Sequence, residues 1–419
     1  MRRNCRIEKI DLMNFEEKYK LVERKVLDEK YWDFIRMNFF NDIKSKVNKI
    51  AFIADFDKKI KLSEIKISFK NLKKYLFCRK KHYDAIFVVD PKRIIQNNKY
   101  ESQFSDSLST IVNKDYSVIS LEAPNWAELN FNCPTHFFNC TTSNIKYVDF
   151  FEIEYLMKKK IFLLFNKRKK RKIEEELKII IEYANKHFNI NLFDRINIYM
   201  DIILYILIMK KKYIKIIKKY SPKIAFLQYR PTKFKQLLNS VFKELDIPTV
   251  EIQHGVLTGQ ETKDYTLIKN YTYLTTSNYF FAFSEKLISY PYYCIDKGNI
   301  KFIGYPFLDN KFLSLNGTER KEKYILIISQ SVIGNNFVNF TSELSDLLEK
   351  YDNSIKIIFK YHPNEVSREY LKLRKHNIIE VKNIDSDIYE LMKDAFLQIG
   401  SYSTAIYEGL KFRFAYSYN

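Results

Sequence analysis

Two histidines lie at the ends of short apolar runs, beside residue types that bind phosphate or transfer protons. His362 belongs to the segment KYHPNE, which begins at Lys360 and directly follows an apolar run. Pro363 fixes its own φ and disfavours helical geometry at His362, so the imidazole is expected in an extended segment. Lys360 adds a positive charge. The segment is therefore a candidate anion-binding site, although a lone histidine is more often structural.

Hydroxyl-bearing residues follow two other apolar runs, at 329–331 (SQS) and 400–404 (GSYST). Such loops can present hydroxyls and backbone N–H groups to a phosphate, but serine is also a common helix cap. Ser403 or Thr404 would cap the next helix, whose N-terminus attracts anions. Glu408 lies about one helical turn further on. Its carboxylate could accept ribose or sugar hydroxyls, or form a capping or surface salt bridge.

The second histidine, His254, follows the run PTVEI and precedes the segment GQETKDY, which contains Glu261 and Asp264. Any of these three side chains could act as a general base toward an acceptor hydroxyl. Glycine marks the same region, because all eight glycines of the chain come after His254. Glycine is expected where the backbone needs positive φ or close approach to a ligand.

The elements that position these residues are predicted from the alternation of apolar runs and amphipathic segments. A strand, a helix and a second strand between 221 and 253 form a βαβ unit. Helices are predicted near 345, 370, 390 and 407. Strands are predicted at 224–228, 247–253, 279–283, 300–303, 324–328, 355–360, 378–381 and 396–399. The alternation after residue 323 indicates a doubly wound α/β domain, which binds ligands beyond the carboxyl ends of its strands. The polar residues above fall at such ends.

The first half is less regular. Residues 1–45 are predicted to be helical, and 151–220 to form a long, basic helical insertion. Strands are predicted at 50–56 and 84–90, whereas 100–150 give few signals. The predicted core residues of the first helices are Trp32, Phe34, Met37 and Phe40. The domain boundaries that follow are 1–309, a polar linker at 310–323, and 324–419.

The chain carries 71 Lys and Arg against 50 Asp and Glu, a net charge of +21. This charge indicates either an anionic partner or a composition rich in Lys, Ile, Asn, Tyr and Phe together. No zinc-finger or RNP-like motif accompanies it, so we expect no nucleic-acid partner. The segments 158–172 and 210–220 mix basic and large apolar residues. They suit peripheral attachment to anionic lipid, or are solvated helix faces whose apolar side lies in the core.

The other expectations concern compartment and metal. The five cysteines are scattered, and the N-terminal residues are polar and lack a signal-peptide pattern. Both observations predict that the protein lies in the reducing cytoplasm, and the inner face of the cytoplasmic membrane is included in this prediction. No cluster has the spacing of a metal site. Asp385-Ser386-Asp387 matches the DxD string of some transferases, but it directly precedes a helical run and is predicted to be a cap. We expect neither a metal nor a cofactor.

The segments VEIQHG, FIGYPFLD, KYHPNE and SYSTAIYEGL, in this order, resemble bacterial GT-B-fold glycosyltransferases that build surface polysaccharides. The resemblance is to capsule, O-antigen and lipooligosaccharide enzymes, including the polysialyltransferase-like and CDP-glycerol transferase-like groups, and covers about residues 221–412. It implies two Rossmann-like domains facing across a cleft and metal-independent transfer. The chain stops soon after Glu408, so the C-terminal domain is expected to be short for the family.

The resemblance also implies roles for the residues above. The nucleotide-sugar donor, CMP- or UDP-linked, would be bound by Ser329, Gln330, Lys360, His362, Pro363, Ser401, Ser403, Thr404 and Glu408. His254, Glu261 and Asp264 would face an oligosaccharide or lipid-linked glycan acceptor from the first domain. The alternatives are CDP-glycerol or polyol-phosphate transfer on the same fold, and an inactive scaffold with a truncated donor domain.

Overall fold

The computed structural model describes most of the chain. The described residues are 9–48, 62–76, 82–89, 93–96, 98–123, 140, 144–228, 232–255, 273–287, 295–315, 324–330, 333–352, 354–362, 369–382, 386–401 and 403–414. Those up to Gly304 form one compact unit, and those from Tyr305 onward form a second. The predicted linker at 310–323 is wrong over 310–315, which belong to the helix α9 (Pro306–Leu315) of the second unit.

The first unit is built on a parallel sheet whose strands are short, buried apolar runs. Its seven strands in the described part of the chain lie in the order β11 (Ile300–Phe302), β10 (Tyr279–Ala282), β9 (Thr249–Ile252), β8 (Ile224–Gln228), β3 (Ala85–Val89), β6 (Val118–Glu122) and β7 (Ile145–Tyr147). Every neighbouring pair is parallel. From β3 the chain adds β6 and β7 on one side and then β8 to β11 on the other. This arrangement defines a doubly wound sheet.

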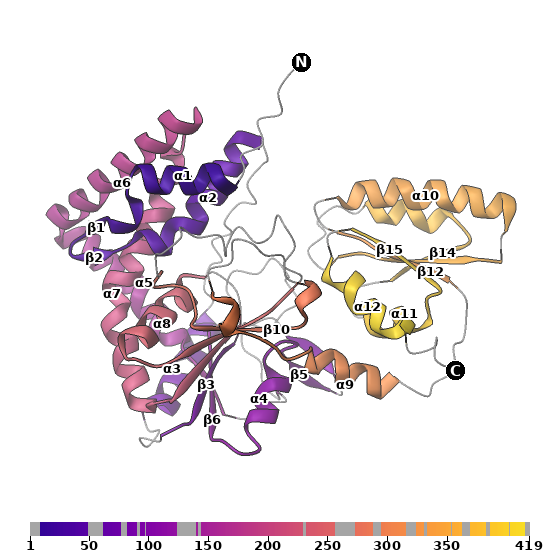
Figure 1. The fold of residues 1–419 in the computed structure, drawn as a ribbon, viewed down its shortest axis with the longest axis horizontal. Helices are drawn as coiled ribbons and strands as arrows, with labels where there is room; N and C mark the ends of the chain where they lie inside the picture. Colours follow the sequence, from indigo (N-terminus) through magenta and orange to yellow (C-terminus); the bar gives the residue numbers. More distant parts are fainter. Residues whose placement is uncertain are drawn as a thin grey trace. The chain divides into compact units, whose positions relative to one another are not determined.

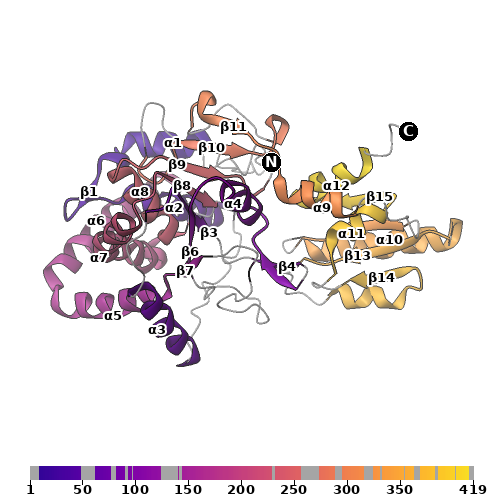
Figure 2. The same cartoon turned by 90° about the horizontal axis from the view of Figure 1, so that it is seen from below.

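Helices cover this sheet and extend beyond it (Figure 1). Their bounds are α1 (Lys9–Lys18), α2 (Trp32–Asn48), α3 (Leu62–Leu76), α4 (Asp106–Val112), α5 (Asp149–Phe165), α6 (Lys167–Phe188), α7 (Ile196–Tyr220) and α8 (Lys233–Glu244). Figure 2 shows α5, α6 and α7 together on one side of the unit. The predicted basic helical insertion at 151–220 therefore corresponds to these three helices.

Small elements complete the first unit. Two antiparallel pairs join β1 (Lys25–Val26) to β2 (Glu29–Lys30) and β4 (Ile94–Gln96) to β5 (Lys99–Glu101). Three of the predicted core residues of α2 are buried, namely Trp32, Phe34 and Phe40. Met37 is only half-buried. The strand predicted at 50–56 lies outside the described residues. No helix among the described residues is long and apolar enough to span a bilayer.

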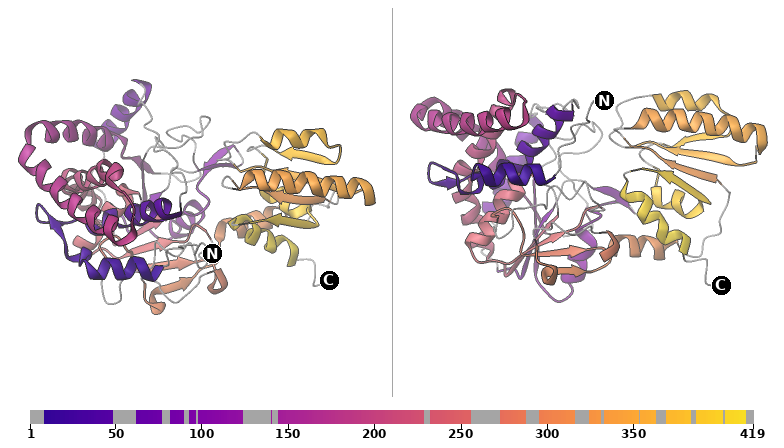
Figure 3. Two further views of the ribbon diagram at one scale, coloured as in Figure 1. Left: turned by 90° about the horizontal axis from the view of Figure 1, so that it is seen from above. Right: turned by 45° about the horizontal axis from the view of Figure 1, so that its top comes forward.

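The second unit is also a parallel sheet covered by helices, with fewer strands among its described residues. Its parallel sheet has the order β14 (Ile379–Lys382), β13 (Lys356–Lys360), β12 (Tyr324–Ile328) and β15 (Leu397–Gly400). The helix α10 (Gly334–Tyr351) covers one face, and α11 (Ile388–Asp394) and α12 (Thr404–Phe414) cover the other (Figures 1 and 3). All four strands agree with the predicted ones within a residue or two. The helix predicted near 370 is instead a 3₁₀ helix, Glu369–Lys375.

Candidate functional site

The polar segments of the second unit meet at one edge of its sheet. The register pairs Ile328 of β12 with Lys360 of β13 and with Gly400 of β15, and it pairs Lys360 with Lys382 of β14. The last residues of the four strands are therefore level across the sheet. Because the strands are parallel, the loops that follow all leave from this carboxyl edge. The structure thus brings the predicted residues at 329–330, 360–362, 401, 403 and 404 to one side of the unit.

The strand order places a switch point at this edge. β12 lies between β13 and β15, and the loop after β12 leads to α10 on one face, whereas the loop after β15 leads to α12 on the opposite face. Loops that diverge in this way open a crevice, which is where doubly wound sheets bind ligands. Both helices also begin here, and the N–H groups of a helix N-terminus attract anions. Ile333 precedes α10, and its side chain makes no capping hydrogen bond.

Ser329 and Lys360 are buried residues at this carboxyl edge. The backbone N–H of Ser329 donates to the carbonyl of Lys360 at 3.0 Å, which continues the ladder between β12 and β13 by one residue. Ser329 is only 1% exposed, and its Oγ has no hydrogen-bond partner within the described part of the chain. Lys360 is 6% exposed. A buried hydroxyl and a buried cation at a helix N-terminus suit an anionic ligand.

The segment after β13 is anchored by an aromatic pair. The Tyr361 ring stacks on the Tyr370 ring of the 3₁₀ helix, with centroids 4.3 Å apart and planes inclined by 9°. This contact fixes the backbone immediately before His362, which is half-buried at the carboxyl edge. Gln330, in the loop after β12, is also half-buried. Pro363 lies outside the described residues.

The loop after β15 combines a close backbone approach with a helix cap. A β-carbon at Gly400 would lie 3.2 Å from the carbonyl oxygen of Ile328, so glycine keeps β15 close to β12. Ser403 Oγ accepts a hydrogen bond from the Ala405 N–H at 3.3 Å, which confirms the predicted cap of α12. Ser401 and Thr404 are half-buried beside it. The hydroxyls of this loop therefore surround the first turn of α12.

Glu408 lies one turn further along α12 and is neither an N-cap nor part of an ion pair within the described residues. Its Oε2 accepts a hydrogen bond from the Tyr389 hydroxyl of α11 at 2.9 Å. Burial raises the pKa of the Glu408 carboxyl from its ordinary 4.5 to about 7, although the Tyr389 hydroxyl acts in the opposite direction. One carboxylate oxygen is thus held by the fold.

The raised pKa gives Glu408 a measurable effect on stability. The native state retains a proton that the unfolded chain releases, so the free energy of unfolding should fall as the pH rises from about 4.5 to about 7. The slope is at most about 1.4 kcal/mol for each pH unit. Glu408→Gln keeps an acceptor for Tyr389 but cannot titrate, so its urea-unfolding profile should lack this slope. Identical profiles for the two proteins would contradict the pKa assignment.

One further predicted feature of this unit is structural. Asp387 caps α11, because its Oδ1 accepts from the Tyr389 N–H at 2.9 Å, while its Oδ2 pairs with Lys311 Nζ at 2.6 Å. The prediction that Asp385-Ser386-Asp387 is a cap is therefore confirmed at Asp387, and Asp385 lies outside the described residues.

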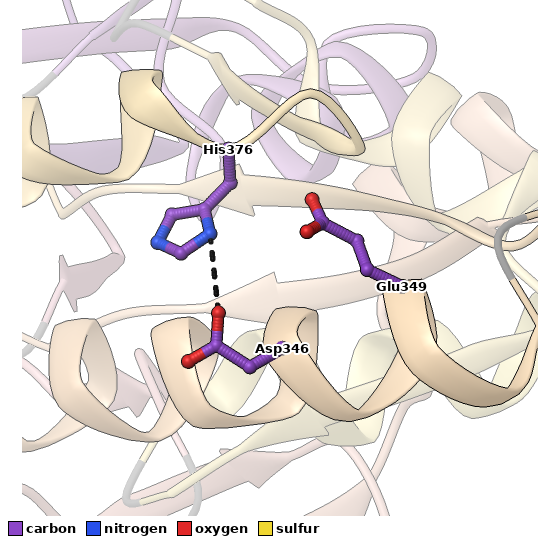
Figure 4. A group of neighbouring side chains, drawn as sticks. All are labelled: Asp346, Glu349 and His376. Atoms are coloured by element: carbon purple, nitrogen blue, oxygen red, sulfur yellow. Dashed lines mark ion pairs between the residues drawn. The ribbon is translucent and has the colours of Figure 1, made fainter.

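One group of side chains in the described part of the chain could hold a metal ion. Figure 4 shows the His376 ring close to the Asp346 and Glu349 carboxylates of α10. One potential ligand atom from each residue lies within 4.8 Å of the other two. His376 Nδ1 is 3.6 Å from Asp346 Oδ1, and its Nε2 is 2.9 Å from the Ser342 hydroxyl. α10 ends just before β13, and His376 lies just before β14. The group is therefore at the amino edge, opposite the polar loops.

In the first unit, Gln253 positions the segment that contains His254. The Gln253 side chain accepts from the Phe283 N–H at 2.6 Å and donates to the Gly255 carbonyl at 2.6 Å. These bonds tie the loop after β9 to the end of β10. His254 is consequently held at the carboxyl edge of the first sheet, where it is half-buried. Glu261 and Asp264 lie outside the described residues.

The first unit also contains a buried polar cluster that sequence reasoning missed. Arg93 pairs with Asp106 of α4 and with Glu122, the last residue of β6, both at 2.7 Å. Nearby, the Ser102 hydroxyl donates to the side chain of Gln228, the last residue of β8, at 3.0 Å. Burial acts against the charge of Arg93, but the two carboxylates keep the pKa of its guanidinium above the ordinary value. The cluster lies beside the switch point between β3 and β8.

No protein-family model matches this chain, and no curated protein matches it. Several solved structures are similar over most of its length. A UDP-GlcNAc 2-epimerase from Methanocaldococcus jannaschii, in complex with UDP-GlcNAc and UDP, is 14% identical with a TM-score of 0.41, over 77% of this chain and 80% of that chain. The spinosyn rhamnosyltransferase SpnG is 9% identical with a TM-score of 0.38, over 78% of this chain and 77% of that chain.

The wall teichoic acid polymerase TagF is 11% identical with a TM-score of 0.39, over 84% of this chain and 77% of that chain. The class of the fold follows from the strand order of the chain itself. It is an α/β protein whose two units each contain a doubly wound parallel sheet.

Proposed function

We propose that the chain is a GT-B-type glycosyltransferase that moves a sugar from a nucleotide-sugar donor to a hydroxyl of a growing cell-surface polysaccharide. The observation that carries the proposal is the level register of Ile328, Lys360 and Gly400 at a switch point. It gathers a buried lysine, several hydroxyls and two helix N-termini at one carboxyl edge. These groups suit the phosphates of a nucleotide.

In this proposal the second unit binds the donor. Lys360, His362 and the N-termini of α10 and α12 neutralise the nucleotide phosphates, a task that a metal ion performs in other enzymes. Ser329, Gln330, Pro363, Ser401, Ser403 and Thr404 would complete the phosphate site. Glu408 would accept a hydroxyl of the ribose or of the sugar. No step of this scheme uses a metal or a cofactor.

The first unit would bind the acceptor. His254, Glu261 or Asp264 takes the proton from the acceptor hydroxyl as its oxygen attacks the anomeric carbon of the donor sugar. The bond between that carbon and the phosphate oxygen breaks, and the nucleotide leaves with the negative charge. The Gln253 hydrogen bonds, which fix the backbone on both sides of His254, favour this histidine for the role.

A thermal-shift screen with CMP, CDP, UDP and GDP tests the proposed donor site. A nucleotide that binds only the native state should stabilise it by about 2.7 kcal/mol at a concentration of 100 times its Kd. The matched controls are cytidine and uridine, which keep the bases but lack phosphate and should give a much smaller shift. If none of the four nucleotides raises the melting temperature, the proposed function is wrong.

The same phosphate-binding edge would also suit a CDP-linked polyol. Product analysis with CDP-glycerol, a CMP-sugar and a UDP-sugar therefore follows the binding screen. We expect transfer of the sugar, with release of the nucleotide. Transfer of glycerol phosphate with release of CMP would instead identify a polyol-phosphate transferase.

A further inference from the structure

The outward face of α5 is apolar near its C-terminal end. The exposed fractions of its large apolar residues are 41% for Leu156, 62% for Met157, 54% for Ile161, 68% for Leu164 and 80% for Phe165. The spacing of 157, 161 and 164 places these residues along one side of the helix. On the opposite side, Phe151 and Tyr155 are buried in the core of the unit. α5 therefore has apolar residues on both its inner and its outer faces.

Basic side chains border this face. Lys158 and Lys160 flank it on α5, with Lys158 2.7 Å from Glu154, and α6 begins immediately afterward with six basic residues, 167–172. Within α6, Lys170 lies 3.4 Å from Glu174 and Arg171 lies 2.7 Å from Glu175. The other four make no ion pair with any described residue. Further along α6, Ile173 and Leu177 are fully buried, so the core holds this basic end beside the end of α5.

The segment at 210–220 has a similar sequence pattern but a different structure. Its apolar residues Tyr213, Ile216, Ile217 and Tyr220 are buried in the core of the unit. Lys210 lies 3.0 Å from carboxylate oxygens of both Glu29 and Glu244. This segment is therefore a solvated helix face with a buried apolar side. Of the two segments that the sequence singled out, only the one at 158–172 exposes apolar and basic side chains together.

We propose that residues 156–172, the α5–α6 tip, attach the protein to an anionic lipid membrane. The exposed aliphatic and aromatic side chains would enter the region between headgroups and acyl chains, and the lysines and arginines would contact lipid phosphates. Stable peripheral attachment needs both contributions, and the tip supplies both where two consecutive helices meet. A nucleic acid would match the charge but would leave the aliphatic side chains in water. The proposal is independent of the transferase activity.

The test is co-sedimentation of the full chain with vesicles of phosphatidylcholine alone or of an equimolar mixture with phosphatidylglycerol. We expect binding to the mixed vesicles only, weakening as salt is added. The variant Arg168→Glu/Lys169→Glu/Lys172→Glu should reduce binding at least about a hundredfold, since each basic residue contributes about one factor of five. Its control, Lys211→Glu/Lys215→Glu/Lys218→Glu, makes the same charge change on exposed residues of α7 and should bind more tightly than the tip variant.

The apolar contribution has its own matched pair of variants. Leu164→Ser/Phe165→Ser should weaken binding at least tenfold, whereas Leu313→Ser/Tyr351→Ser, which alters similarly exposed residues of α9 and α10, should not. Circular dichroism checks that each variant is folded. The proposal is overturned if both lipid compositions bind equally, or if the tip variants behave as their controls do. Loss of a dimer in Leu164→Ser/Phe165→Ser, without loss of vesicle binding, would assign the face to a second copy of the chain and also overturn it.

Discussion

Replacing His362 with alanine is expected to slow sugar transfer by about 10²- to 10⁴-fold while the protein stays folded. The imidazole follows β13 at the carboxyl edge, next to the stacked pair of Tyr361 and Tyr370 that fixes its backbone. It would act only on the charge that develops on the departing nucleotide. The loss should therefore appear in kcat and in kcat/KM for the donor, and the melting temperature of the free protein should change little.

A matched histidine in the same unit controls for general effects of the substitution. His376 is also half-buried, but it lies at the opposite edge of the sheet, where it contacts Ser342 and Asp346. His376→Ala should keep nearly full transferase activity. An active and folded His362→Ala protein would remove His362 from the mechanism. Equal losses in the two variants would point to destabilisation of the unit as their common cause.

The second large effect concerns stability. Arg93→Ala should destabilise the first unit by about 3–5 kcal/mol, because removing one partner of a buried ion pair leaves uncompensated charge. The side chain of Arg93 is fully buried, and its guanidinium pairs with Asp106 and with Glu122. The substitution would leave two buried carboxylates without their guanidinium partner and away from water. Urea unfolding of the wild-type and variant proteins, followed by circular dichroism, measures the difference.

The control for this prediction is an arginine with similar local geometry at the surface. Arg171 lies 2.7 Å from Glu175, but its side chain is 80% exposed, so Arg171→Ala should change stability by less than about 1 kcal/mol. Rescue provides a second check. Arg93→Met combined with Asp106→Asn and Glu122→Gln removes all three charges, and it should recover part of the stability that Arg93→Ala loses. A loss of less than about 1 kcal/mol in Arg93→Ala would mean that the cluster contributes little.

The sequence predicted most strands of both sheets because a buried parallel strand is a short apolar run. The run Ala85–Val89 is an example, since all five of its residues are buried. β6 was missed for the opposite reason. It contains Ser120 and ends in Glu122, and both are buried although their side chains are polar. A tertiary partner, Arg93, lies 29 positions away in the chain and pairs with the buried Glu122 carboxylate.

The candidate donor edge was largely predictable, because polar residues that directly follow apolar runs must lie at strand ends. The sequence could not provide the register that makes those ends level, nor the position of β12 between β13 and β15. The sequence also could not distinguish the basic segment at 158–172 from the one at 210–220, because both mix basic and large apolar residues. Whether the apolar side chains of such a segment face the core depends on which neighbouring helices pack against it. At 210–220 they do, and at 156–165 many do not.

The two sheets share one topology, because β7-β6-β3-β8 and β14-β13-β12-β15 have the same order relative to the chain. Their crevices nevertheless differ in electrostatic character. In the first unit the guanidinium of Arg93 lies between the carboxylates of Asp106 and Glu122, so one cation faces two anions in a buried cluster. In the second, the buried residue Lys360 and the N-termini of α10 and α12 lie at the carboxyl edge of the sheet. Under the proposed function, such a difference would direct the anionic nucleotide to the second unit and leave the first unit to the uncharged glycan.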